Sequence, residues 1–407
     1  MQLVAYGAQD IYLTGNPQIT FFKVVYRRHT NFAVESIEQT FSGATGLDKR
    51  VTATISRNGD LVKGMHLETV LGGGRATSGA GNILVKECEL EIGGQLIDRH
   101  YAEWLNIWTE LSTPEGSRAG YDDMVGNTPF LLDLDTGAAF VSDNLADKTY
   151  YTPLQFWFCR NPGLALPLIA LQYHEVKINL TTNTAANLLG GSTAVTMTSM
   201  KLYVDYVYLD TDERRRFAQV SHEYLIEQVQ FTGDESVTDG SNKNATLNFN
   251  HPVKELIWVA RSGVADTHPF DFRDTHSAEA DAGATTNKLD TFTTAKLQLN
   301  GHDRFSERNA DYFRKVQNFE HHTRVPRTVS YDNALNGDRG QYIYSYSFAL
   351  KPEDHQPTGT CNFSRIDNAI LQLTTMNVTG NGVLKVYAVN YNVLRIMSGM
   401  GGLAYSN

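Results

Sequence analysis

Hydrophobic and polar residues alternate with a period of two along much of the chain, as in strands that bury one face. The clearest cases are ECELEIGG at 87–94 and KLYVDYVYL at 201–209. In the first half the pattern predicts strands near 32–42, 50–57, 63–71, 83–92, 153–159, 172–180 and 198–209. It leaves one further strand in each half unplaced.

A different period marks two helices. Residues 99–111, RHYAEWLNIWTEL, carry apolar side chains three and four positions apart. This spacing predicts a helix that docks on the first domain through Trp104 and Trp108. A second helix is expected at 210–220, where Asp210 is a candidate N-cap.

The strand pattern restarts after this second helix and repeats earlier motifs in the same order. Val62-Lys63 is echoed by Val253-Lys254, and LEIGGQLIDR at 90–99 by LQLNGHDRF at 297–305. The offset, roughly 190 residues, is far longer than a solenoid repeat, so each copy is a domain. Strands of the second copy are expected near 223–232, 243–250, 253–261, 293–300, 341–350, 368–375 and 383–396.

These elements define an all-β chain with two similar domains. Seven or eight short strands per copy, joined by long connections, indicate a sandwich or a jelly roll. We expect an extended N-terminal arm at 1–31, a first domain at 32–218 and a second domain at 219–407.

Charge is unevenly distributed along the 407 residues. The net charge is -10, which argues against a protein that coats nucleic acid. The arm, however, concentrates bases: Lys23, Arg27 and Arg28 alternate with aromatic residues. Either the arm packs its aromatic rings on the body, or it docks on an acidic partner.

Cysteine usage and hydropathy indicate the compartment. Three widely spaced cysteines form neither a disulfide framework nor a zinc pattern, which fits a reducing environment. The N-terminus has no secretory signal pattern, and no stretch reaches the roughly 18 clean apolar residues of a membrane helix. We therefore expect synthesis in the cytoplasm.

Asp135-Thr136-Gly137 resembles the catalytic loop of an aspartic protease, a two-lobed all-β enzyme. That chemistry needs two carboxylates sharing a proton, one from each lobe. The second copy has no such triplet, and Asp133 stands where an apolar strand residue is usual. A surface turn is the better interpretation.

The other candidate motifs also lack their partners. His174-Glu175 and His222-Glu223 have no second histidine four residues after the first, and His321-His322 has no third ligand in view. The glycine-rich segment 71–81 lacks the Lys and Ser or Thr of a phosphate-binding loop and leads into an expected strand. We expect no catalytic, cofactor or metal site.

Four segments nevertheless resemble one known family. They are GAQDIYLTGNPQITFFKVVYRRHTNF (7–32), IGGQLIDRHYAEWLNIW (92–108), SFALKPEDHQPTGTCNFSRID (347–367) and VYAVNYNVLRIMSGMGGLAYSN (386–407). They resemble the major capsid proteins of nucleocytoplasmic large DNA viruses, and the algal-virus branch most closely. The resemblance implies two tandem eight-stranded antiparallel jelly rolls with short helices in the connecting loops.

The resemblance also implies a function: a structural subunit of an icosahedral capsid. It implies homotrimeric, pseudo-hexameric capsomers that tile the shell beside neighbouring capsomers. Minor capsid proteins would lie beneath, with direct or indirect contact to an internal membrane, and no sequence-specific nucleic-acid binding is expected. The arm would then lie on the inner face, with Lys23, Arg27 and Arg28 towards acidic partners.

The alternative is a lectin-like carbohydrate-binding module, because single jelly rolls also bind sugars. A lectin would be expected to show acids, Asn and an aromatic residue clustered in the loops of each copy. No such cluster recurs at the offset of the repeat.

Overall fold

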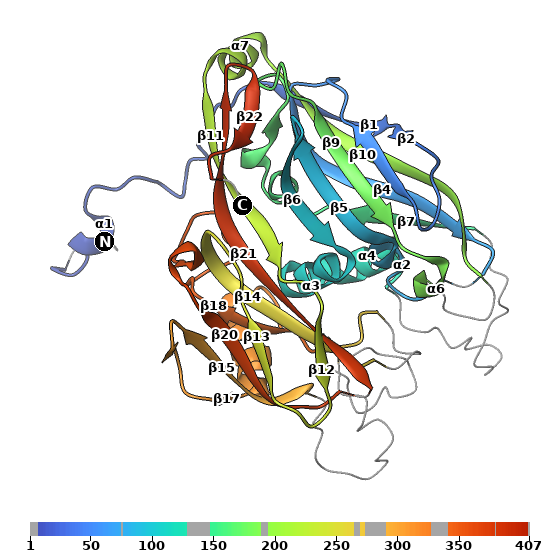
Figure 1. Ribbon diagram of the computed structural model, residues 1–407. Coiled ribbons are helices and arrows are strands. Elements are labelled where there is room, and N and C mark those ends of the chain that lie inside the picture. Colours follow the sequence, from blue (N-terminus) through green and yellow to red (C-terminus); the bar gives the residue numbers. More distant parts are fainter. Residues whose placement is uncertain are drawn as a thin grey trace, which may run out of the picture.

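The computed structural model describes residues 7–74, 76–127, 147–188, 194–263, 269–272, 290–326, 341–378 and 380–405. Their strands form four antiparallel sheets, shown in Figure 1. Two sheets use strands between residues 32 and 209, and the other two use strands between residues 222 and 403. Within the described residues, no sheet takes strands from both sides of α7 (Thr211–Gln219).

The first two sheets pack face to face as a jelly roll. One has the order β1 (Phe32–Gln39), β10 (Thr196–Leu209), β4 (Leu61–Gly72) and β7 (Lys148–Pro153), with β8 (Leu166–Pro167) beside β4. The other has the order β2 (Phe41–Ser42), β3 (Arg50–Thr54), β9 (Val176–Thr182), β5 (Val85–Ile92) and β6 (Gln95–Tyr101). Leu67, Leu90, Ile178 and Leu202 are fully buried in the core of this jelly roll.

The second pair of sheets repeats this strand order. One contains β11 (His222–Phe231), β21 (Asn381–Met397), β14 (Pro252–Arg261) and β18 (Tyr344–Ser347); the other contains β13 (Lys243–Thr246), β20 (Ala369–Met376), β15 (Phe292–Leu299) and β16 (His302–Asp303). Short strands extend them: β12 (Glu235–Thr238), β17 (Arg308–Asn309), β19 (Cys361–Asn362) and β22 (Met400–Leu403). The predicted double jelly roll is confirmed.

The same hairpin in each jelly roll contains the strand that the sequence pattern left unplaced. Gly93 and Gly94 have φ of 58° and 85°, and Asn300 and Gly301 have φ of 50° and 80°. Two consecutive positive φ angles define a type I′ turn, which favours Gly and Asn. The turns lead into β6 and β16, so the echo between 90–99 and 297–305 is one repeated hairpin.

Three other local expectations need correction. The helix predicted from residue 99 is α3 (Ala102–Ser112), because residues 99–101 pair with β5 as part of β6. The strand predicted at 153–159 is β7 ending at Pro153, followed by the short helix α5 (Trp157–Arg160). The glycine-rich segment leads into α2 (Ala80–Leu84), whose N-cap Gly79 has a φ of 73°, and not directly into a strand.

The remaining helices are short and lie in connections. The sequence pattern did not predict α4 (Glu115–Val125), which has few apolar residues and buries Arg118 and Val125. The others are α1 (Ile11–Thr14), α6 (Ala185–Leu188), α8 (Gln317–His321), a π-helix at Tyr312–Val316 and 3₁₀ turns at Pro162–Leu164 and Phe363–Arg365. Among the described residues, no helix has the length and apolar character needed to cross a bilayer.

Candidate functional site: interdomain seam and N-terminal arm

Helix α3 lies in the seam between the two jelly rolls. The side chains of Trp104 and Trp108 are 0% and 5% exposed, and their ring centroids are 5.8 Å apart. Trp104 also lies 5.5 Å from the ring of Tyr387 in β21, and the guanidinium of Arg160 lies 4.0 Å from the Trp108 ring. The helix therefore contacts the second jelly roll as well as the first.

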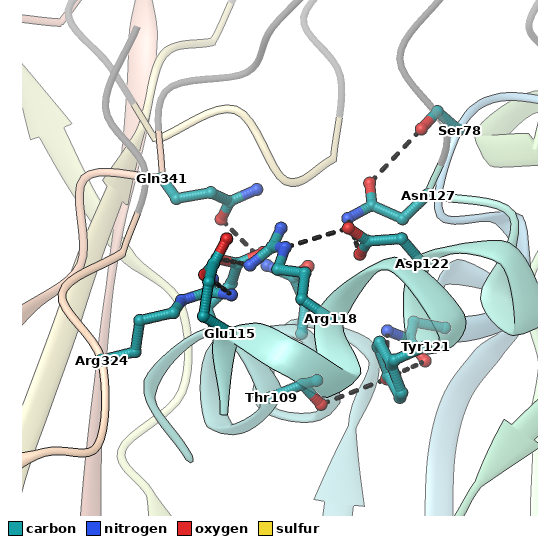
Figure 2. A network of polar contacts seen from close by, with 12 residues as sticks. Ser78, Thr109, Glu115, Arg118, Tyr121, Asp122, Asn127, Arg324 and Gln341 are labelled. Carbon is teal, nitrogen blue, oxygen red and sulfur yellow. Dashed lines mark hydrogen bonds and ion pairs between the residues drawn. The ribbon is translucent and has the colours of Figure 1, made fainter. Parts of the chain in front are cut away.

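The buried carboxylate of Glu110 on α3 joins arginines from both jelly rolls. Figure 2 shows the two arginines, Arg118 and Arg324, with the polar side chains around them. Glu110 accepts hydrogen bonds from Arg118 Nη1 at 2.6 Å and from Arg118 Nη2 at 2.5 Å. Arg324, from the second jelly roll, donates to the same carboxylate. Arg118 Nε also donates to Asp122 at 2.9 Å. Such charge-assisted pairs are strong and directional, so they fix the relative position of the two domains.

A direct side-chain hydrogen bond crosses the seam beside this carboxylate. Asn106 Nδ2 donates to Gln341 Oε1 at 3.0 Å, and both residues are buried. A buried amide that lost its partner would carry the full cost of desolvation. The pair therefore favours one docking geometry over small displacements.

A second group of polar contacts joins β6 to β11. Gln228 Nε2 donates to the carbonyl of Ile97, and the amide of Val229 donates to Asp98 Oδ1 at 3.1 Å. The carboxylate of Asp98 also lies 2.9 Å from His100 Nε2, and both side chains are buried. An edge strand of the first jelly roll is therefore bound to the first strand of the second.

Glu227 on β11 pairs with two cations from different domains. Its carboxylate lies 3.0 Å from Arg160 Nη1 and 2.8 Å from Lys254 Nζ. The side chain of Lys254 is 0% exposed. A charge buried this deeply persists only when it is paired, so these contacts act as one unit.

The C-terminal hairpin, which is the end of β21 together with β22, crosses from the second jelly roll onto the first. Leu394 and Ile396 belong to the hydrophobic core of the first jelly roll. The amide of Tyr173 donates to the carbonyl of Gly399 at 2.9 Å, and the amide of Leu403 donates to Gln95 Oε1 at 3.2 Å. The hairpin thus completes the first domain with residues from the second.

The sequence predicts no metal ligand set at His321-His322. In the structure, His322 contacts two carboxylates. Its imidazole lies 3.2 Å from Glu255 and 3.0 Å from Glu353, and the side chains of His322 and Glu255 are both 0% exposed. Although burial alone would lower the pKa of His322, the two carboxylates raise it to about 9. Burial would raise the pKa of Glu255, but His322 lowers it. The group is a buried ion-pair cluster inside the second jelly roll.

The other candidate motifs have structural partners or lie outside the described residues. His174 Nδ1 contacts the carbonyl of Gly401 at 2.8 Å, and His222 Nε2 contacts the carbonyl of Phe217 at 2.8 Å. Asp135-Thr136-Gly137 lies outside the described residues. Across the described ranges, no three His, Cys, Asp or Glu side chains are grouped so that they could hold a metal ion.

The cysteines are poorly placed for nucleophilic chemistry. Burial raises the pKa of Cys159 to about 12 and raises that of Cys88 further. The thiolate is the reactive form, so both thiols are inert near neutral pH.

The N-terminal arm projects away from the body in Figure 1. Its large apolar side chains are 66–97% exposed. Within the described part of the chain, the arm residues hydrogen-bond only to one another. Lys23, Arg27 and Arg28 are exposed along it. The alternative in which the arm packs its rings on the body is therefore wrong for this structure.

The repeated strand order defines the class of the molecule: a double jelly-roll protein. Comparison with protein families agrees, since residues 20–210 match the model for "Major capsid protein N-terminus" and residues 213–402 match "Large eukaryotic DNA virus major capsid protein". The chain belongs to the major capsid protein family of large eukaryotic DNA viruses.

Individual relatives support the assignment over the full length. The chain is 56% identical to the major capsid protein of Pyramimonas orientalis virus and 44% identical to that of Paramecium bursaria Chlorella virus 1, covering 100% of this chain and 99% of each relative. The crystal structure of PBCV-1 VP54 matches with a TM-score of 0.78 and 40% identity, over 95% of this chain and 100% of VP54. The Faustovirus major capsid protein, at 13% identity and a TM-score of 0.73, supports the fold alone.

These comparisons confirm the family, the fold and the function expected from the sequence. The chain is a structural subunit of a viral capsid and resides in the virion. The comparisons thus support the shell subunit over the lectin-like alternative. Sequence reasoning missed the contacts of Glu110 and Glu227, because no motif marks a carboxylate whose partners lie far along the chain.

Proposed function

We propose that three copies of the chain form a capsomer with a pseudo-hexagonal outline, and that these capsomers tile an icosahedral shell. The observation that carries this proposal is the repeated strand order in two jelly rolls joined by a buried polar seam. A closed trimer of such chains presents six similar domains, so its edges can repeat across a hexagonal lattice. The proposed domain limits are 1–31 for the arm, 32–218 and 219–407.

The arm is proposed to lie on the inner face of the shell, above minor capsid proteins and an internal membrane. Lys23, Arg27 and Arg28 are exposed on a segment that, within the described residues, forms no hydrogen bond to its own body. A Lys or Arg near an anionic surface gains about 1 kcal/mol, which is screened within roughly a Debye length. Three bases can therefore orient the capsomer without fixing it alone.

The proposal includes no catalysis and no sequence-specific nucleic-acid binding. Outside the arm the chain is acidic, which disfavours contact with phosphate backbones. Synthesis in the host cytoplasm is consistent with the free thiols of Cys88, Cys159 and Cys361.

The purified full-length chain provides the test. Analytical ultracentrifugation should give the mass of three 45.3 kDa chains, and negative-stain electron microscopy should show six-lobed particles. A protein that stays monomeric at high concentration, or forms rings of another symmetry, would contradict the proposal.

A further inference from the structure

One end of the body carries an exposed apolar patch. The tip of the C-terminal hairpin places Met397 opposite Met400, and the two side chains are 49% and 52% exposed. Tyr173, 75% exposed, lies against the same tip, because a Cβ on Gly399 would come within 2.6 Å of its ring. We call Tyr173, Met397 and Met400 the hairpin-tip patch.

The N-terminal arm leaves the body at this same end. Phe32, the first residue of β1, pairs with Leu209, which lies two residues before α7. Helix α7 has 9 residues and so spans about 14 Å. It leads to His222, whose partner Ile396 adjoins the hairpin-tip patch. Figure 1 shows α7, β11 and β22 together at this end.

The arm is long enough to reach such a patch on an adjacent copy. Six residue steps separate Tyr26 from Phe32, which at about 3.4 Å per residue span roughly 20 Å. The arm does not cover the patch of its own chain, since both are exposed in the structure. The arm and the patch are both apolar, and both are exposed to water at the same end of the chain. Because the chain assembles with copies of itself, the arm of one copy can cover the patch of another.

The alternation within the arm indicates which side would dock. In the structure residues 21–23 form a turn and a bend, and Phe22, Val24 and Tyr26 are 97%, 77% and 87% exposed. Once residues 22–26 extend along a partner, these three side chains would lie on one face. The opposite face is interrupted by Lys23. The uninterrupted apolar face suits the patch, and Lys23 would then remain directed away from it.

Charge near the patch agrees with this orientation. Glu175 and Glu223, 66% and 60% exposed at their side chains, lie beside Tyr173 and at the start of β11. Arg28 follows Tyr26 on the docking face of the arm, so it would approach these carboxylates. Each acid already has one basic neighbour in its own chain, Lys177 or Arg395, so the charge contribution is secondary to apolar burial.

We propose that residues 22–26 of the arm dock on the hairpin-tip patch of a second copy of the chain. In this exchange each subunit places its arm on a neighbouring subunit, at the end of the body where the arms emerge. The side chains of Lys23 and Arg27 then point away from the patch and can contact the acidic partners beneath the shell. This inference rests on the proposed assembly of copies into capsomers, and it names which surfaces meet.

Cross-linking between two different full-length variants tests the exchange. Phe22→Cys and Tyr173→Cys chains, carrying different tags, are co-expressed and treated with a short bismaleimide. The matched control replaces Tyr173→Cys with Phe319→Cys, because Phe319 is 79% exposed on the second jelly roll. The unsubstituted chain measures any reaction of the native cysteines.

The expected result is a covalent dimer containing both tags, several-fold more abundant with Tyr173→Cys than with Phe319→Cys. Replacing Phe22→Cys with Phe21→Cys, on the opposite face, should reduce that yield. Equal yields for the two partner positions, or no dimer in samples that sediment as assembled particles, would overturn the exchange while leaving the capsomer proposal intact.

Two further outcomes are decisive. A chain that carries both Phe22→Cys and Tyr173→Cys and cross-links only within itself would show that the arm folds back on its own body, which overturns the exchange. A chain that sediments only as a monomer and gives no cross-link would overturn both the exchange and the proposed capsomer.

Discussion

Glu110 of the first jelly roll accepts a hydrogen bond from Arg324 of the second, 214 residues further along the chain. The same carboxylate holds Arg118 through two hydrogen bonds. One buried carboxylate therefore pairs with two cations from different domains. The geometry of the whole two-domain body depends on this contact more than on any exposed ion pair.

Glu110→Gln should destabilise the protein by about 3–5 kcal/mol, because it removes the buried carboxylate that both guanidinium groups share. Within the described residues, Arg118 would keep only Asp122, and Arg324 only the exposed Glu115. The free energy of unfolding in a denaturant titration measures this loss. Glu115→Gln is the control: Glu115 lies 3.7 Å from Arg324 but is 67% exposed, so its change should stay within about 0.5 kcal/mol. Similar losses for both variants would show that burial does not set the strength of these pairs.

Trp104→Ala should cost about 3–5 kcal/mol, because the fully buried indole fills the seam. Part of that cost should depend on Tyr387, whose ring lies 5.5 Å away. A double-mutant cycle with Trp104→Leu and Tyr387→Leu should give a coupling of about 0.5–1.5 kcal/mol. Phe319→Ala, at a side chain that is 79% exposed, is the control and should change little. If the losses in unfolding free energy of the two single variants simply add, Trp104 and Tyr387 do not stabilise each other, and α3 does not couple the two domains through this pair.

His322 should make stability depend on pH on the alkaline side. Its pKa is raised from 6.5 to about 9 in the folded chain. The raised pKa contributes stability that is fully present below about pH 6.5 and is lost as the pH rises through about 9. The contribution is roughly 3 kcal/mol at most.

Unfolding free energies measured between pH 6 and pH 9 should therefore fall more steeply for the natural chain than for His322→Gln. His321→Gln, on the neighbouring and more exposed imidazole, should keep the natural slope. The thiols of Cys88 and Cys159 begin to ionise in the unfolded chain towards pH 9, but they do so in all three proteins, so their effect cancels when the slopes are compared. Equal slopes for all three proteins would refute the role of the His322 cluster.

Changing Lys23, Arg27 and Arg28 together to Gln should leave capsomers intact and weaken their binding to vesicles that contain anionic lipid. The natural chain should bind less as salt is added, because the attraction is screened. Vesicle co-sedimentation at two salt concentrations measures both effects.

The control for this arm variant changes Lys86, Lys351 and Arg365, three exposed bases of the body, to Gln. It removes the same charge and should bind vesicles as the natural chain does. Loss of the capsomer in the arm variant, or equal loss of binding in both variants, would reject the assignment of the arm to the inner face.

The sequence predicted what depends on local pattern and failed where distant residues meet. The alternation in β5 and β10, and the echo of the 90–99 hairpin at 297–305, are local signals that the fold preserves. The spacing of Trp104 and Trp108 predicted a buried helix, yet its contact with Tyr387 has no local signature. The strand β16 has only two residues, so no periodicity could reveal it.

The arm illustrates a different limit. Its aromatic residues resemble those of a core, and sequence alone could not tell whether that core is in the same chain. In the structure Phe21 and Phe22 are 89% and 97% exposed, so the described part of their own chain does not cover them. Exposed aromatic residues of this kind have the sequence pattern of core residues, and only the fold distinguishes the two.

The C-terminal hairpin also imposes an order on synthesis. Leu394 and Ile396 complete the core of the first jelly roll, although they leave the ribosome long after its own strands. Most of the first domain therefore waits, incomplete, until nearly the entire chain has been translated. An interrupted chain would lack these two side chains and the contact of Gly399 with Tyr173. Translation that stops early thus yields a subunit whose first jelly roll lacks part of its hydrophobic core.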